Sequence, residues 1–156
     1  RAGVGRLTVY RHFPDERSLL GACTGHYLSL NPPPNPTVWA EIADREARLE
    51  AALAAVYAYF ERTEGMMARA ENESPANAVL AELMTPFHAH WAAMRDQLAA
   101  AWNVDGAPNP LVAAAIGHAL AFTTWRSLAR LQGLSREHAI ALMLELVRAA
   151  ARSELG

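Results

Sequence analysis

The chain has 156 residues, of which 52% are hydrophobic and 19% charged, a composition that supports a packed core and excludes disorder over most of its length. The net charge of −2 argues against a protein coated in nucleic acid, but the charge is unevenly spread. Four arginines and two acidic residues fall within the first 30 positions, which leaves the remainder acidic. A basic head on an acidic body suits a small DNA-reading module attached to a body that does not contact DNA.

The cysteine and lysine content indicates the cellular compartment of the protein and the kind of genome that encodes it. Cys23 is the single cysteine, so no disulfide can form within the chain, and this suits a reducing cytoplasm. All 14 basic residues are arginine, which together with the abundant alanine indicates a GC-rich bacterial genome. The longest weakly polar stretch, residues 112–125, is shorter than the ~20 residues that a membrane span needs. We therefore expect a cytoplasmic protein that does not associate with a membrane.

The first 37 residues predict two helices and a linker. A short helix fits residues 6–13 and is closed by Pro14. Asp15 is a candidate N-cap for a second helix over residues 16–30, with an apolar face along one side. Four prolines within residues 32–36 then predict a stiff, extended connector. We therefore expect a head of residues 1–30, a linker of residues 31–37 and a body of residues 38–156.

The body has the periodicity of long helices, and strand signals are nearly missing, so the predicted fold class is all-α. An apolar stripe at helical spacing predicts the first long helix, with a turn near Gly65. Ser74 and Pro75 are predicted to begin the next helix, in which Pro86 marks a kink or break. The stripe of the first long helix consists of Leu49, Leu53, Val56, Tyr57 and Phe60.

Two closing helices are predicted after a loop over residues 103–110. The first covers residues 111–132 and ends at Gly133. The second covers residues 135 to about 153, with Ser135 as its N-cap. The body is thus expected to be an antiparallel helical domain.

The short helix over residues 6–13 has the pattern of a helix that reads DNA. At about 100° per residue, Val9 and Phe13 fall together on the side that faces a core. Arg11 lies on the opposite side with Leu7 and Thr8, while Tyr10 and His12 lie on the two flanks. A helix in the major groove needs this arrangement, because its outer face meets base edges and its flanks meet phosphates. The alternative is an ordinary amphipathic helix with incidental polar residues.

Residues 2–20 resemble the recognition helix and following turn of the TetR family of transcriptional regulators. The common pattern of that family runs A-G-V-x-x-x-T-x-Y-x-H-F-x-x-K-x-x-L-L. One position departs, because Glu16 stands where the family usually has a lysine that touches the DNA backbone; either Arg17 supplies this contact or it is weakened. The matching residues are Ala2, Gly3, Val4, Thr8, Tyr10, His12, Phe13, Leu19 and Leu20.

The resemblance implies a set of DNA contacts and a larger head. Thr8, Tyr10 and His12 would contact phosphates, whereas Arg6, Leu7 and Arg11 would approach bases. The family's first helix and most of its second have no counterpart here, so we expect roughly 25–35 further residues upstream, which would complete a three-helix DNA-binding unit. The DNA-binding residues predicted in total are Arg6, Leu7, Thr8, Tyr10, Arg11, His12 and Arg17.

Methionine and aromatic residues are numerous in the body, and they have two interpretations. Most can be core residues, but helical interiors rich in these side chains also form apolar ligand pockets. The resemblance implies such a pocket in the middle of the body, for a small apolar effector. The candidate pocket residues are Tyr57, Phe60, Met66, Met67, Phe87, His88, Trp91, Met94, Phe122 and Trp125.

The sequence indicates neither a metal site nor a catalytic site. His88 and His90 are two positions apart and point to different sides of a helix, whereas zinc ligands on one helix are usually four apart. No nucleophile elbow and no phosphate-binding loop is present. We therefore expect no metal, no cofactor and no enzymatic activity.

The two closing helices carry small residues and a broad apolar face. Burial within one subunit would account for both features. The resemblance implies instead a homodimer with a two-fold interface of four helices, two from each subunit. The candidate interface residues are Ala115, Ala119, Leu142, Met143, Leu146, Val147 and Ala150.

These features together predict a regulator that binds a palindromic operator in double-stranded DNA and is released by the effector, as is usual for repressors of the family. The alternative is a helical small-molecule-binding protein or enzyme that has lost DNA binding. Glu16 in place of lysine is the feature that favours this alternative.

Overall fold

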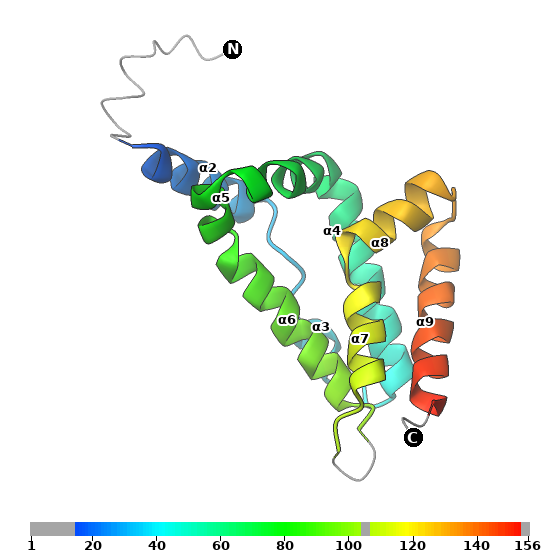
Figure 1. The fold of residues 1–156 in the computed structure, drawn as a ribbon. Coiled ribbons are helices and arrows are strands. Elements are labelled where there is room, and N and C mark those ends of the chain that lie inside the picture. The colour runs from blue at the N-terminus through cyan, green and yellow to red at the C-terminus, as the bar shows by residue number, and fades with distance from the viewer. Residues whose placement is uncertain (1–14, 104–106, 154–156) are drawn as a thin grey trace.

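A computed structural model describes residues 15–103 and 107–153 of the chain (Figure 1), and it confirms the all-α prediction. The longest helix, α4, lies at the centre, and the elements that surround it are shorter. In chain order the elements are α2 (Glu16–Leu30), α3 (Thr37–Ala40), α4 (Arg45–Glu73), the 3₁₀ turn η1 (Ser74–Ala76), α5 (Ala78–Leu83), α6 (Thr85–Ala100), α7 (Pro110–Ala119), α8 (Phe122–Arg126), the π-helical turn η2 (Ser127–Leu131) and α9 (Arg136–Arg152).

The core forms where α4, α6, α7 and α9 pack together, and α2 lies against α5 at the other end of the molecule (Figure 1). All five residues of the predicted α4 stripe have no exposed surface, because spacings of three and four residues place them on one face of the helix. Trp39 of α3 and Trp125 of α8 are almost completely buried against this face. α2 differs from the other long helices, since none of its residues is fully buried.

Local signals at the ends of the helices are confirmed. The Asp15 carboxylate accepts a hydrogen bond from the Ser18 amide (2.7 Å), so Asp15 caps α2. The Ser135 hydroxyl accepts a hydrogen bond from the His138 amide and caps α9. Gly133 has a φ of +68°, a left-handed conformation that favours glycine, and it separates η2 from α9. Each of these positions depends on neighbouring residues alone, which is why the sequence could predict it.

Three predicted boundaries are wrong. α4 continues through Gly65 without a turn, because buried Thr63 and Met67 extend the apolar face on both sides of it. Ser74 begins only a 3₁₀ turn, and the Asn77 side chain caps α5 by accepting a hydrogen bond from the Leu80 amide. The helix predicted over residues 111–132 is three elements, α7, α8 and η2. The break predicted at Pro86 does occur, as the junction between α5 and α6.

Candidate functional site

A cavity of about 540 Å³ lies between α2, α4, α5 and the start of α6. α2 contributes Leu20, Cys23 and Tyr27 to its wall, and the facing side of α4 contributes Tyr59 and Met66. Apolar side chains of α5 close a third side. The cavity therefore separates α2 from the packed core, which explains why no residue of α2 is fully buried.

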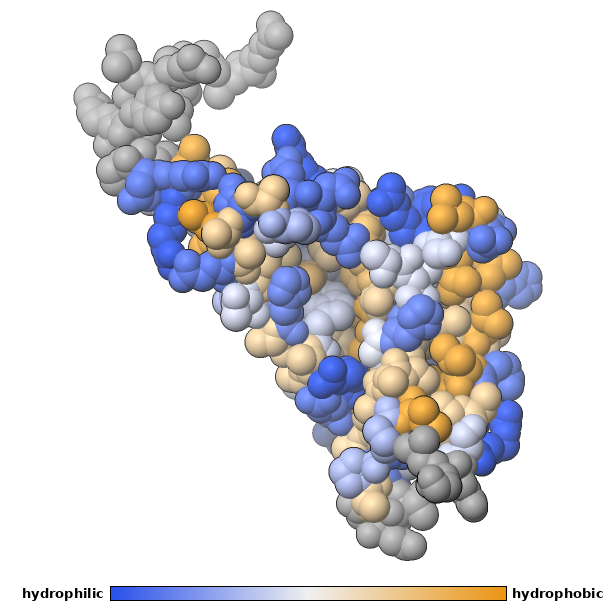
Figure 2. All heavy atoms as spheres, in the orientation of Figure 1, coloured by the Kyte–Doolittle hydropathy of each residue, from blue (hydrophilic) through white to orange (hydrophobic). Residues whose placement is uncertain are grey.

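A second cavity of about 250 Å³ adjoins the first, between the end of α4, α6 and α8. Met67, Ala70, Met84 and Phe87 line both cavities, so they form the boundary between them. The molecular surface is hollowed between α6 and α8 (Figure 2). The aromatic rings that line the second cavity come from Phe60, Phe87, Trp91 and Phe122.

Seven of the ten predicted pocket residues line one of these cavities. Met66 lines the larger cavity, and Met67 and Phe87 line both. The residues of this group that line only the smaller cavity are Phe60, His88, Trp91 and Phe122.

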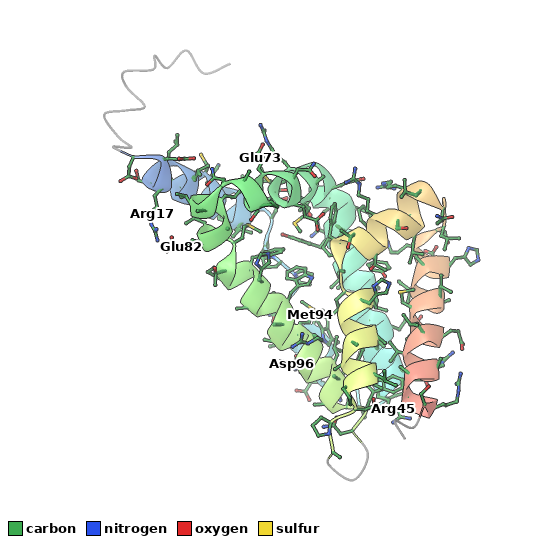
Figure 3. The ribbon with its side chains drawn as sticks, in the orientation of Figure 1. Arg17, Arg45, Glu73, Glu82, Met94 and Asp96 are labelled. Carbon is green, nitrogen blue, oxygen red and sulfur yellow. The ribbon has the colours of Figure 1, made fainter. Side chains whose placement is uncertain are left out.

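The other three predicted pocket residues, Tyr57, Met94 and Trp125, are at most 1% exposed and line neither cavity. Met94 points from α6 into the packed interior (Figure 3). The Tyr57 hydroxyl donates a hydrogen bond to the Ala119 carbonyl (3.0 Å), and burial raises the pKa of Tyr57 far above its usual value. In the described residues these three side chains therefore hold the core together instead of lining a void.

The wall that α2 supplies to the larger cavity was missed by sequence reasoning, which assigned this helix to the head. The signal that could have found it is the apolar face of α2, which needs a partner in the body. The α2 residues that line the cavity are Leu20, Gly21, Cys23, Thr24, Gly25, Tyr27 and Leu28, and the α5 residues are Leu80 and Leu83.

Few polar groups reach the larger cavity. Burial raises the pKa of Tyr27 above its usual value and that of Tyr59 to about 12, so both hydroxyls stay protonated at neutral pH. Arg69 and Glu73 also line it, but they form an ion pair with each other (2.8 Å). The cavity thus offers an apolar wall with neutral hydroxyl groups and a charge-balanced rim.

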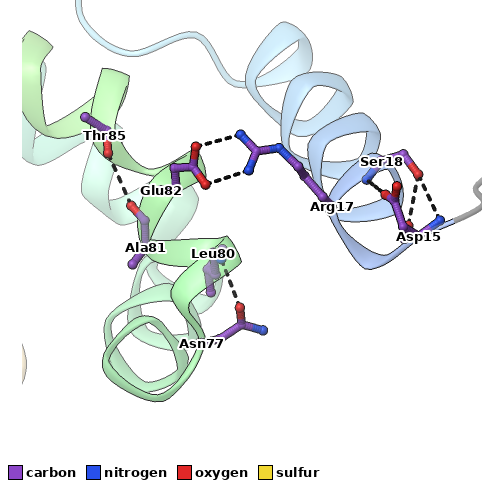
Figure 4. Close-up of polar contacts among 8 residues, drawn as sticks. All are labelled: Asp15, Arg17, Ser18, Asn77, Leu80, Ala81, Glu82 and Thr85. Carbon is purple, nitrogen blue, oxygen red and sulfur yellow. Dashed lines mark hydrogen bonds and ion pairs between the residues drawn. The ribbon is translucent and has the colours of Figure 1, made fainter.

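Two polar contacts fasten α2 to α5 beside this cavity. Arg17 donates two hydrogen bonds to the two carboxylate oxygens of Glu82, each 2.6 Å long (Figure 4). Asn77 donates a further hydrogen bond to Glu16 (2.9 Å). Arg17 and Glu82 point toward one another from the two helices (Figure 3), and the pair holds the pKa of Glu82 below its usual value. We call these four residues the α2–α5 clasp.

The α2–α5 clasp includes Arg17, which is the one predicted DNA-contacting residue that the structure describes. The guanidinium of Arg17 is paired with Glu82 and is therefore occupied. The other predicted DNA contacts, namely Arg6, Leu7, Thr8, Tyr10, Arg11 and His12, lie outside the described residues.

The predicted dimer residues divide into an outer and an inner group. Leu142 is 47% exposed and Leu146 is 39% exposed, and apolar surface gathers along α9 beside α7 (Figure 2). The inner group packs within the single chain. Its side chains therefore lie beneath the surface that a partner subunit would contact. This group consists of Ala115, Ala119, Met143 and Val147, which are buried, and Ala150, which is half-buried.

The chain matches no family model, no curated protein and no solved structure in the comparisons made. The described residues themselves define an all-α chain with two adjoining cavities, an exposed apolar strip on α9 and a clasp between α2 and α5. In this part of the chain, no three His, Cys, Asp or Glu side chains are grouped to hold a metal ion. No described helix has both the length and the apolarity that crossing a bilayer requires.

Proposed function

We propose that this protein is a transcriptional regulator of the TetR type, a homodimer that binds a palindromic DNA operator and releases it when a small apolar ligand occupies the body. The observation that carries the proposal is the position of the larger cavity. One wall of it is α2, the helix that directly follows the predicted recognition helix. A ligand there would contact the element that joins the DNA-reading head to the body.

The mechanism follows from this position. The recognition helices of a dimer must reach successive major grooves, about 34–36 Å apart. A ligand between α2 and α4 favours whichever placement of α2 gives it the better contacts, and it can shift the equilibrium only by that difference in affinity. A change in the placement of α2 would sacrifice little packing, because none of its residues is fully buried.

DNA binding is tested by a gel shift with the full-length protein and DNA that flanks its own coding region. We expect a palindromic fragment to be retarded at low salt. His12→Ala and Tyr10→Phe should weaken binding to every sequence, whereas Arg11→Ala should also change the base preference. If no flanking fragment is retarded at low salt, the regulator proposal is wrong.

The clasp leads to a separate prediction, which concerns the strength of DNA binding. Glu82→Gln removes the carboxylate that holds Arg17, so Arg17 becomes free to contact a phosphate. We expect the affinity for operator DNA to rise about fivefold at low salt and the gain to shrink as salt rises, since each phosphate contact adds to the salt dependence. Quantitative gel shifts at several salt concentrations measure both effects.

Two further variants complete this test. Arg17→Gln combined with Glu82→Gln should show no gain, because the freed cation is missing. Glu73→Gln removes the same charge from an acid that pairs with Arg69 instead, and it should leave the affinity unchanged. Both Arg17 and Glu82 are 58% exposed, so loss of the pair should alter the folding stability little. A gain that persists without Arg17 would show that the clasp does not act through this residue.

A second candidate function is a helical small-molecule-binding protein or enzyme that no longer binds DNA. Two features favour it: Glu16 stands where the TetR pattern has lysine, and the neighbouring Arg17 is already paired with Glu82. Full-length protein that binds an apolar ligand and yet retards no DNA would support this candidate over the regulator.

A further inference from the structure

Four aromatic rings line the smaller cavity, whereas leucine and methionine side chains form much of the wall of the larger one. The rings of Phe87 and Trp91 are stacked with centroids 4.4 Å apart, and Phe60 lies 6.0 Å from Trp91 and 5.4 Å from Phe122. The Trp91 indole N–H donates a hydrogen bond to the Leu120 carbonyl (3.1 Å), which fixes the orientation of this ring. The faces of such rings attract cations.

One formally charged side chain lines this cavity, and it is acidic. Glu71, in the last turn of α4, lines it and forms no ion pair in the part of the chain that the structure describes. Burial raises the pKa of Glu71, and the positive charge of Arg126 opposes this effect. Arg126 does not line the cavity, and Arg69 is paired with Glu73. A bound ligand therefore meets one carboxylate that forms no described ion pair, and no arginine lines this cavity.

The adjoining larger cavity suits an apolar group. Its volume of about 540 Å³ exceeds the 250 Å³ of the smaller one, and leucine and methionine side chains form much of its wall. The boundary between the cavities consists largely of Met67, Met84 and Phe87. Methionine side chains are flexible, so one ligand could extend through this boundary from one cavity into the other.

We propose that the effector is a lipophilic cation, whose positive group lies in the smaller cavity between Glu71 and the four aromatic rings and whose apolar tail lies in the larger cavity. This inference rests on the proposed ligand-binding function, and it adds the charge and the orientation of the ligand. The aromatic faces and the carboxylate attract a positive group together, whereas an anion would meet the like charge of Glu71.

The test uses three probes with tails of similar length: octyltrimethylammonium, 1-nonanol and nonanoate, each below its micellar concentration. Isothermal titration calorimetry measures their dissociation constants for the full-length protein. We expect the cation to bind about tenfold more tightly than the alcohol, and the anion to bind most weakly. Glu71→Gln should weaken binding of the cation about tenfold and leave the alcohol unchanged.

The control is Glu50→Gln, an identical change of charge at an exposed position of α4 that lines neither cavity, and it should alter none of the three affinities. If the alcohol binds as tightly as the cation, or if Glu71→Gln leaves the affinity for the cation unchanged, the inference is wrong while an apolar ligand site stands. If none of the probes binds, both the inference and the ligand-binding part of the proposed function are wrong. DNA binding is measured independently, so its failure is distinguishable from either result.

Discussion

Replacing Phe60 with alanine is expected to lower the free energy of unfolding by about 3–5 kcal/mol. Phe60 has no exposed surface, and its ring lies between 5.4 and 6.1 Å from four other rings, which α4, α6 and α8 supply. Removing it leaves a void that large, tightly packed neighbours can fill only in part. Chemical denaturation followed by circular dichroism at 222 nm, a wavelength that reports on helix in general, measures the loss.

Met66→Ala is the matched control for this prediction. Met66 lies on the same helix and lines the larger cavity, but it is 43% exposed. Its removal should cost clearly less than that of Phe60, about 1 kcal/mol, because Met66 keeps 43% of its surface in water and borders a cavity. A cost for Phe60→Ala no greater than that for Met66→Ala would mean that the aromatic cluster does not join α4 to α6 and α8 as its distances indicate.

Regular burial and local capping were predictable from the sequence because they depend on near neighbours. The α4 stripe repeats every three or four residues, and all of its members are buried. Asp15 and Ser135 each cap a helix through an amide three residues ahead, and Gly133 adopts the conformation in which only glycine is unstrained. None of these features requires knowledge of what a distant segment does.

The features that were missed depend on distant segments. Glycine costs about 1 kcal/mol in a helix interior, yet burial of the side chains around Gly65 keeps α4 continuous. Arg17 and Glu82 are 65 positions apart, so no local pattern pairs them. Tyr57 and Phe60 are both completely buried and equally apolar in the sequence pattern, yet only Phe60 borders a cavity. Which side of a residue faces a void is decided by packing.

The short helix α5 connects the two features on which the proposed regulation depends. Its Leu80 and Leu83 line the larger cavity, and its Glu82 holds Arg17 of α2. A ligand that displaces the leucines would therefore also move the carboxylate that binds Arg17. The cavity and the contact that holds α2 thus lie on one short helix, through which the proposed ligand could act on α2.

The proposed homodimer gives the second large effect, because replacing both Leu142 and Leu146 with glutamate is expected to raise the dimer dissociation constant at least about 100-fold. Both side chains are exposed in the single chain, so the substitutions should cost little folding stability. In a two-fold interface of four helices, the two new carboxylates of each subunit, four in the dimer, would instead be buried without a partner. Sedimentation velocity over a range of protein concentrations measures the dissociation constant.

The control for this variant is Ala141→Glu, which adds a negative charge to an exposed position on the opposite flank of α9. The salt bridge from Arg148 to Glu46 (2.6 Å) places this flank toward α4, away from the side that Leu142 and Leu146 occupy. Ala141→Glu should therefore leave the dimer intact. If the double variant sediments as the same species as the unmodified protein, the apolar surface of α9 that Leu142 and Leu146 form is not the proposed dimer interface.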